Sequence, residues 1–264
     1  MSNAAGSGAP RALLFDLDGT LYTDAGPVPG AVEALAALRR RGVPFRCVTN
    51  TTRRSRRLLA LRLSGYGFLV PPAEIISAPL ACVSLLRSRG VRRVAAYVAD
   101  DTLEDFAAFD LAAARPEAVV VGDLGDAWDF AKLNRAFLAL MDGAELIALQ
   151  RDRYWLRGDG LALDAGPFVA ALEYATGKTA TVFGKPSGAF YAAALATLPA
   201  AVAAAPAGVV MVGDDLWGDV EGAQRAGLTA WMVRTGKFRE DVVAASGITP
   251  DRILDSVAEL PSLF

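Results

Sequence analysis

Two aspartates, Asp16 and Asp18, stand two residues apart after the apolar run 12–15 and directly before Gly19. A short apolar run bounded by a glycine turn is typical of a buried parallel strand, and open α/β sheets place ligands at the carboxyl ends of such strands. Burying two carboxylates together is costly unless they share a cation, and Mg²⁺ prefers hard oxygen ligands. Ordinary turn chemistry explains the pair equally well, so other parts of the chain must decide.

Three later stretches repeat this arrangement of polar residues after an apolar run. In a doubly wound sheet the strand ends converge on one crevice, so these residues are expected to meet. The set contains carboxylates, small donors and one ammonium, which phosphoryl transfer requires: one carboxylate attacks phosphorus, while a metal, a lysine and hydrogen-bond donors hold the equatorial oxygens. The stretches contribute Thr49 and Asn50, then Lys185, then Asp214, Asp215 and Asp219.

Composition narrows the function classes. The chain has 264 residues, is 53% hydrophobic, carries a net charge of -2 and contains no histidine. The charge gives no reason to expect nucleic acid or an anionic membrane as a partner, and the missing histidine excludes histidine triads, histidine bases and histidine-ligated zinc. The two cysteines, Cys47 and Cys82, are expected to be reduced core residues of a cytoplasmic protein.

The elements alternate between strand and helix, which predicts an α/β fold with a parallel sheet. Early examples are the helix 30–41, the strand 44–48 and the helix 55–64. Towards the C-terminus we expect a helix over 220–226 and a closing helix over 254–260, while 154–160 is expected to be a loop. The uncharged stretch 188–213 is interrupted by two prolines, so a membrane-spanning helix is not expected there.

Taken in order, the motifs Asp16-Leu17-Asp18-Gly19-Thr20-Leu21, Thr49-Asn50, Gly184-Lys185-Pro186 and Gly213-Asp214-Asp215 with Asp219 resemble those of the haloacid dehalogenase superfamily of phosphatases. The long interval between Asn50 and Lys185 matches the class with an α/β cap inserted between the second and third motifs. The resemblance implies a doubly wound, Rossmann-like catalytic core of residues 11–80 and 180–264 and a cap of residues 81–179. The polar, Gly-rich composition of residues 1–10 predicts a disordered leader.

The resemblance also implies a role for each aspartate. Asp16 would be the nucleophile that forms an aspartyl-phosphate, and its carboxylate would bind Mg²⁺. Asp18 would protonate the leaving oxygen and then take a proton from water, while its backbone carbonyl binds the metal. Asp214 would be the remaining protein ligand. Asp215 and Asp219 would orient metal-bound waters or brace Lys185, although Asp219 also fits the N-cap of the helix expected from Val220.

The other candidates each have a structural alternative. Thr49 and Asn50 would donate to the phosphate, but small polar residues also favour a helix start after a strand. Lys185 would neutralise the phosphate, although most lysines are simply solvated. The arginine cluster 53–57 is more typical of a solvated helix face than of an anion-binding patch. In the cap, a surface turn is the alternative to substrate selection by Trp155, Arg157 and Asp159.

These residues predict a Mg²⁺-dependent phosphatase for a small phosphorylated metabolite. The alternatives are a hydrolase of inorganic pyrophosphate or of phosphoramidates such as phospholysine and phosphohistidine, and a low-turnover phosphate-binding regulatory protein. Asp18 argues against the regulatory alternative, because an acid at that position serves hydrolysis. Related caps are often involved in dimerisation, so a homodimer is an expectation; neither nucleic acid nor a membrane is expected as a partner.

Overall fold

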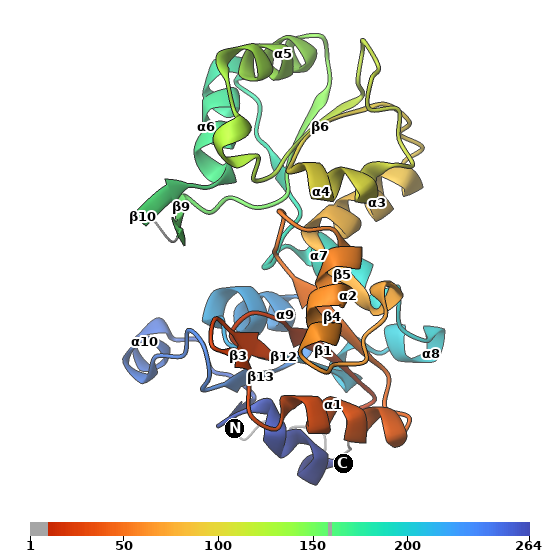
Figure 1. Cartoon of the computed structure of the whole chain (residues 1–264), viewed down its shortest axis with the longest axis vertical. Helices are drawn as coiled ribbons and strands as arrows, with labels where there is room; N and C mark the ends of the chain where they lie inside the picture. Colours follow the sequence, from red (N-terminus) through yellow and green to blue (C-terminus); the bar gives the residue numbers. More distant parts are fainter. Residues whose placement is uncertain (1–9, 158–159) are drawn as a thin grey trace. The chain divides into compact units, whose positions relative to one another are not determined.

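The computed structural model describes residues 10–157 and 160–264, and Figure 1 shows the course of the chain. The chain clusters into two compact units. The first contains the described residues up to Val48 together with Arg62–Ile75 and Ala194–Phe264, and the second contains Thr49–Leu61 and Ile76–Ala193. The sequence analysis assigned residues 49–61, 76–80 and 180–193 to the catalytic core, whereas here they cluster with the second unit. The division into core and cap stays a prediction.

A six-stranded sheet contains β1, the strand that precedes the Asp16–Asp18 motif. Its strands lie in the order β14, β13, β12, β1, β4, β5, and the pairings from β14 to β4 are all parallel. All five residues of β1 and of β12 are buried, as expected for apolar strands covered on both faces. The bounds are β1 Ala12–Asp16, β4 Phe45–Thr49, β5 Ile75–Ser77, β12 Val209–Gly213, β13 Thr229–Val233 and β14 Arg252–Leu254.

The second unit has its own parallel sheet, in the order β11, β8, β7, β6. Alternate residues of these strands enter two different cores. Val120 and Ile147 pack with residues of α3, while Val119 and Leu146 pack with residues of α5 and α6. The bounds are β6 Val94–Tyr97, β7 Ala118–Val121, β8 Glu145–Ala148, β11 Thr181–Val182, α3 Ala78–Ser88, α5 Phe130–Met141 and α6 Ala165–Thr176.

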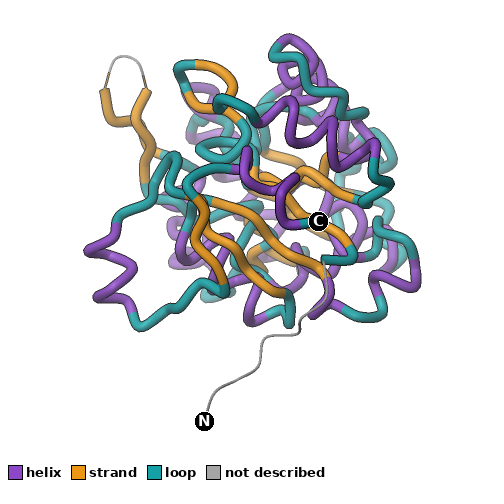
Figure 2. The backbone as a smooth tube through the Cα atoms, turned by 90° about the horizontal axis from the view of Figure 1, so that it is seen from below, coloured by secondary structure: helices purple, strands orange, loops and turns teal. Residues whose placement is uncertain are grey.

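The remaining helices connect or cover these strands, and Figure 2 shows the same backbone with helices and strands in separate colours. Helix α1 buries Ala34, Leu35 and Leu38 along one face, and it packs against the 3-10 segment η6. Among the described residues, no helix is both long and apolar enough to cross a bilayer. The bounds are α1 Ala31–Arg40, α2 Arg56–Gly65, α4 Asp100–Leu103, α7 Gly188–Leu195, α8 Ala200–Ala203, α9 Gly222–Arg225, α10 Glu240–Ser246 and η6 Val257–Leu263.

Three sequence expectations are corrected. The stretch expected to be a loop contains β9 (Tyr154–Arg157), which pairs antiparallel with β10 (Gly160–Leu163); β2 (Tyr22–Thr23) and β3 (Gly26–Pro27) form a second antiparallel pair. The closing segment is strand β14 followed by η6, because Ile253 and Leu254 extend the parallel sheet instead of opening a helix. A helix was expected to begin at Val220, but the chain is already helical from Leu216, the first residue of the π-helical segment η5 (Leu216–Glu221).

Candidate active site

A cluster of three buried carboxylates lies at the carboxyl ends of β1 and β12. Asp16 ends β1, Asp214 directly follows β12, and Asp219 lies in η5. Each offers an oxygen within 4.8 Å of the others, and the three residues are 7%, 1% and 0% exposed. Like charges at this spacing in a buried site repel strongly, so the arrangement favours a cation among them.

Glycines bring the backbone against this cluster. A Cβ atom on Gly19 or on Gly236 would overlap Oδ2 of Asp214, and both residues have a positive φ. A Cβ atom on Gly213 would overlap Oδ2 of Asp219. Any side chain at these positions would displace a carboxylate, so the cluster restricts all three positions to glycine.

The donor set fits a hard divalent cation. Three carboxylates supply oxygen ligands of the kind that Mg²⁺ prefers. The hydroxyl oxygens of Thr20 and Thr235, next to the two glycines that approach Asp214, are buried and have no hydrogen-bond partner among the described residues. Metal-bound waters are suitable partners for such hydroxyls, because Mg²⁺ usually retains several waters.

The structure places the Asp219 carboxylate in the buried cluster and not at a helix N-cap. Its Oδ2 accepts a hydrogen bond from the Asp215 amide at 3.1 Å, and its carboxylate belongs to the buried cluster. The N-cap interpretation of Asp219 is wrong, because η5 begins before it and Asp215 is the capping residue. Oδ1 of Asp215 accepts hydrogen bonds from the amides of Trp217 at 3.0 Å and Gly218 at 2.8 Å.

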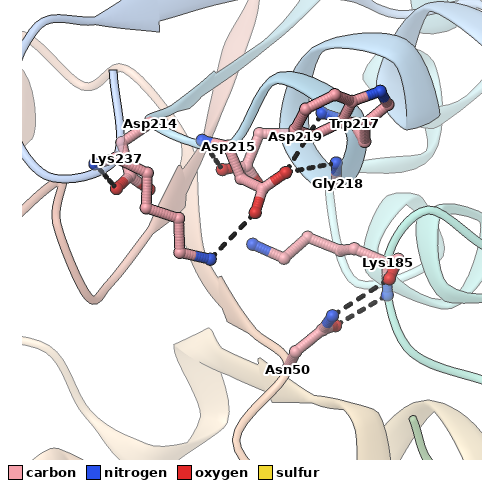
Figure 3. A network of polar contacts seen from close by, with 8 residues as sticks. All are labelled: Asn50, Lys185, Asp214, Asp215, Trp217, Gly218, Asp219 and Lys237. Atoms are coloured by element: carbon pink, nitrogen blue, oxygen red, sulfur yellow. Dashed lines mark hydrogen bonds and ion pairs between the residues drawn. The ribbon is translucent and has the colours of Figure 1, made fainter. Parts of the chain in front are cut away.

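Lys237 is a site residue that the sequence analysis missed. Its amide donates to Oδ2 of Asp214 at 2.7 Å, and its Nζ forms an ion pair with Oδ2 of Asp215 at 2.8 Å (Figure 3). Burial by itself would lower the pKa of Lys237, but the charges of Asp215, Asp214 and Asp16 raise it above its ordinary value. A lysine directly after a glycine beyond β13 was the available signal, and it matches the Gly184-Lys185 pattern.

Asp18 has quite different surroundings from Asp16. Its side chain is 59% exposed, and its carboxylate lies beside the Tyr22 hydroxyl and the Arg62 guanidinium instead of in the buried cluster. The assignment of its backbone carbonyl as a metal ligand stays a prediction.

In the second unit the structure brings Asn50 and Lys185 together. The Asn50 amide nitrogen donates to the Lys185 carbonyl at 3.0 Å, and its oxygen accepts from the Lys185 amide at 2.6 Å (Figure 3). Gly184, the residue before Lys185, has no room for a side chain, since a Cβ atom would lie 2.9 Å from Oδ1 of Asn50. Thr49 is buried at the end of β4, and its hydroxyl accepts from the Thr51 amide at 3.1 Å. Asn50 therefore fixes the main chain that carries Lys185.

The cap candidates and the arginine cluster are the remaining residues that the sequence analysis considered. Trp155 and Arg157 belong to β9, and Asp159 lies outside the described residues. The arginine cluster has structural partners, as the solvated-face interpretation expects. Ion pairs join Arg53 to Asp123 at 3.5 Å, Arg56 to Asp105 at 3.9 Å and Arg57 to Glu104 at 3.3 Å.

Comparison with known proteins shows which families and relatives this chain is similar to. The family model described as haloacid dehalogenase-like hydrolase matches residues 13–112, and a second, HAD-hydrolase-like, model matches residues 182–260. The chain is 44% identical over 231 residues to haloacid dehalogenase-like hydrolase domain-containing protein 2 of Bos taurus, covering 88% of this chain and 86% of that protein. It is 38% identical over 262 residues to human phospholysine phosphohistidine inorganic pyrophosphate phosphatase, covering 96% and 94%.

A solved structure with the same fold carries a metal. The glycerol phosphate phosphatase of Mycobacterium tuberculosis, in complex with calcium, superposes with a TM-score of 0.81 and 31% sequence identity. The match covers 95% of this chain and 74% of that one. The α/β fold class predicted from the sequence is therefore confirmed, both by the parallel sheets and by this likeness.

Proposed function

The chain belongs to the haloacid dehalogenase-like hydrolases, and on that basis we propose that it is a Mg²⁺-dependent phosphatase of a small phosphorylated metabolite. The observation that carries the proposal is the buried cluster of Asp16, Asp214 and Asp219. Three carboxylates in one buried place are suited to hold a divalent cation, and the first of them belongs to the Asp-x-Asp-Gly-Thr motif.

The reaction divides between the two aspartates of that motif. An oxygen of Asp16 forms a bond to phosphorus as the bond from phosphorus to the leaving oxygen breaks, which gives an aspartyl-phosphate. Asp18 donates a proton to the departing oxygen. It then removes a proton from the water that attacks the aspartyl-phosphate, which releases phosphate and restores both side chains.

Other residues supply charge and position. A Mg²⁺ ion held by Asp16, Asp214, Asp219 and the Asp18 carbonyl would neutralise the phosphate oxygens. Lys185 supplies a second positive charge, Asn50 fixes the main chain of Lys185, and Thr49 offers a hydroxyl to the phosphate. Asp215 holds Lys237 and caps η5, which steadies the loop that carries Asp214 and Asp219. In the cap, Trp155, Arg157 and Asp159 are proposed to select the substrate.

A second candidate is the hydrolysis of an anhydride or a phosphoramidate. It is favoured by the 38% identity to the human protein named phospholysine phosphohistidine inorganic pyrophosphate phosphatase. The same nucleophile would serve, but the leaving group would be phosphate or an amine, and the need for a proton from Asp18 would differ accordingly.

The experiment that tests the proposal compares the wild-type protein with Asp16→Asn. Turnover of 4-nitrophenyl phosphate, glycerol phosphate and pyrophosphate is measured with Mg²⁺ and with a chelator. We expect wild-type activity to require the metal, and Asp16→Asn to lose at least about a thousand-fold in kcat. Acid-quenched wild type should also retain labelled phosphate on Asp16. Full Mg²⁺-dependent activity in Asp16→Asn would overturn the mechanism, and the relative rates decide between ester and anhydride.

The compartment is proposed from the cysteines. Cys47 and Cys82 are both free and buried, and burial raises the pKa of each thiol, which makes them unreactive. Two reduced structural thiols fit a reducing compartment, so we assign the protein to the cytoplasm. A homodimer stays a prediction.

A further inference from the structure

The Asp18 carboxylate is held from both sides by groups that donate hydrogen bonds or carry positive charge. The Tyr22 hydroxyl donates to Oδ2 at 3.2 Å, and Nη1 of Arg62 lies 4.0 Å from Oδ1. The phenol can donate a hydrogen bond and the guanidinium carries positive charge, so both attract the side-chain oxygens of Asp18 and restrict their position. An exposed carboxylate without such partners would rotate freely among its rotamers.

Tyr22 is itself fixed. Its side chain is buried, and its ring centroid lies 5.4 Å from that of Tyr66. The Tyr22 carbonyl accepts a hydrogen bond from the Gly19 amide at 2.7 Å, which ties it to the turn that carries Asp18. The hydroxyl therefore reaches Asp18 from a rigid position.

Arg62 is fixed by the same two rings. Its Cζ atom lies 4.4 Å from the Tyr22 ring centroid and 5.8 Å from that of Tyr66. Cation–π contacts of this kind restrain a guanidinium that would otherwise be mobile. At 4.0 Å the guanidinium acts on Asp18 mainly through its charge, while the shorter contact from Tyr22 defines the orientation.

We propose that Tyr22 and Arg62 are positioning residues for the reaction, and that they hold the Asp18 carboxylate where it can protonate the leaving group. The inference rests on the proposed phosphatase function and adds two residues to it. A carboxylate bound to Tyr22 and Arg62 does not enter the buried cluster of Asp16, Asp214 and Asp219. The clamp, defined as Tyr22, Arg62 and Tyr66, thereby separates a proton donor from the neighbouring nucleophile.

The clamp predicts a dependence on the leaving group. Phenyl phosphate and 4-nitrophenyl phosphate have nearly the same size, but the nitro group stabilises the departing phenolate and reduces its need for a proton. A variant with a poorly held Asp18 should therefore lose more rate with phenyl phosphate. The constant kcat/KM reports the steps up to transfer of the phosphoryl group, so it isolates this effect from hydrolysis of the aspartyl-phosphate.

The experiment measures kcat/KM for both esters in wild type, Tyr22→Phe, Arg62→Met and Asp18→Asn, with Mg²⁺ present. Tyr22→Phe removes only the hydroxyl and keeps the ring beneath Arg62. We expect Tyr22→Phe and Arg62→Met to lose about ten-fold with phenyl phosphate and less than about two-fold with 4-nitrophenyl phosphate. Asp18→Asn should show the same pattern with a larger loss. The exposed residues Tyr174 and Arg87 supply matched controls, Tyr174→Phe and Arg87→Met.

The outcomes separate this inference from the proposed function. If Asp16→Asn retains full activity, the phosphatase mechanism itself fails. If Asp16→Asn and Asp18→Asn behave as expected but the clamp variants lower both esters equally, the clamp is a structural feature and the inference fails. Unchanged rates for both esters in Tyr22→Phe and Arg62→Met would also overturn it.

Discussion

Both parallel sheets carry buried polar residues at the carboxyl ends of their strands. The two sets of residues differ in their charge and in the partners that the chain supplies. After β1 and β12 the buried groups include three carboxylates that face one another. After β7 and β8 the buried groups are Asp123 and Gln150. The first set concentrates one sign of charge, while the second consists of donors and acceptors matched within the unit.

The matching in the second unit is specific. Asp123 accepts from the Gly125 amide at 2.8 Å and pairs with Arg53, and its own amide donates to the Thr52 hydroxyl at 3.2 Å. Gln150 donates to Asp164, which in turn accepts from the Ala165 amide at the start of α6. Each polar group is stabilised by the chain itself.

The contrast teaches that burial of polar residues alone does not identify a site. Both sheets bury aspartates, but within the described part of the chain the group whose oxygens could share one metal ion is Asp16, Asp214 and Asp219, for which an external cation is the natural counterpart. The sign of the local charge balance separates a candidate metal site from a structural hydrogen-bond network. Four predictions test this distinction.

The largest expected effect follows from removing one carboxylate of the first cluster. Asp214→Asn should weaken Mg²⁺ binding by about a hundred-fold or more, because a buried anionic ligand becomes neutral. Titration calorimetry measures this without any assay of activity. The wild type should also gain thermal stability on adding Mg²⁺, and the variant should lose that gain. The matched control is Asp123→Asn, for which Mg²⁺ affinity should not change; an equal loss there would remove the distinction between the two sheets.

The second prediction breaks the network of the other unit. Thr52→Val leaves the Asp123 amide without its acceptor, and the free energy of unfolding should fall by about 1–3 kcal/mol. Urea denaturation measures the change. Calorimetry should show unaltered Mg²⁺ affinity in the same variant. A stability equal to that of the wild type would show that the Thr52 hydroxyl is not a needed partner.

The third prediction concerns Asp105 in the second unit. The partners of this carboxylate do not fully offset the cost of burying its charge. Burial raises the pKa of Asp105 to about 6, despite a hydrogen bond from the Arg56 amide and the nearby Arg56 charge. Because the unfolded pKa is near 4, the folded state is favoured by protonation of Asp105. That contribution is complete below about pH 4 and is lost as pH rises through about 6.

Asp105→Asn removes this titration. The stability of the variant relative to wild type should therefore improve by about 1–2 kcal/mol between pH 4 and pH 7. Urea denaturation at several pH values measures the difference. A constant difference across this range would show that Asp105 titrates normally in the folded protein.

The smallest effect is expected from Lys237→Met. The lysine partly neutralises the first cluster, so its removal should tighten Mg²⁺ binding by about two- to five-fold, limited by solvent screening of its exposed side chain. Calorimetry at low salt should show the gain, and the rise in melting temperature on adding Mg²⁺ should be larger than in wild type. Weaker binding in this variant would mean that Lys237 holds Asp215 in a geometry that the metal site requires.

Much of the fold could be predicted because strands and helices depend on near neighbours. The apolar runs before Asp16 and before Asp214 predicted β1 and β12, and the helix predicted over 30–41 contains α1. The antiparallel pair β9 and β10 was missed, although the Gly158-Asp159-Gly160 stretch between two short apolar runs is a sequence signal for a hairpin. The strand β14 was missed because three residues carry too little periodicity to distinguish a strand from a helix.

The sequence by itself determined that Asp16 and Asp214 lie at the carboxyl ends of buried parallel strands, since an apolar run and the turn after it are local features. Only the tertiary structure decided that the Asp219 carboxylate joins them, that Lys237 lies against Asp214 and Asp215, and that Asp18 turns to Tyr22 and Arg62. The physical reason is that a charged side chain takes its direction from the charges and donors around it, and folding supplies several of these from distant parts of the chain: Asp16 for Asp219, Asp214 for Lys237 and Arg62 for Asp18.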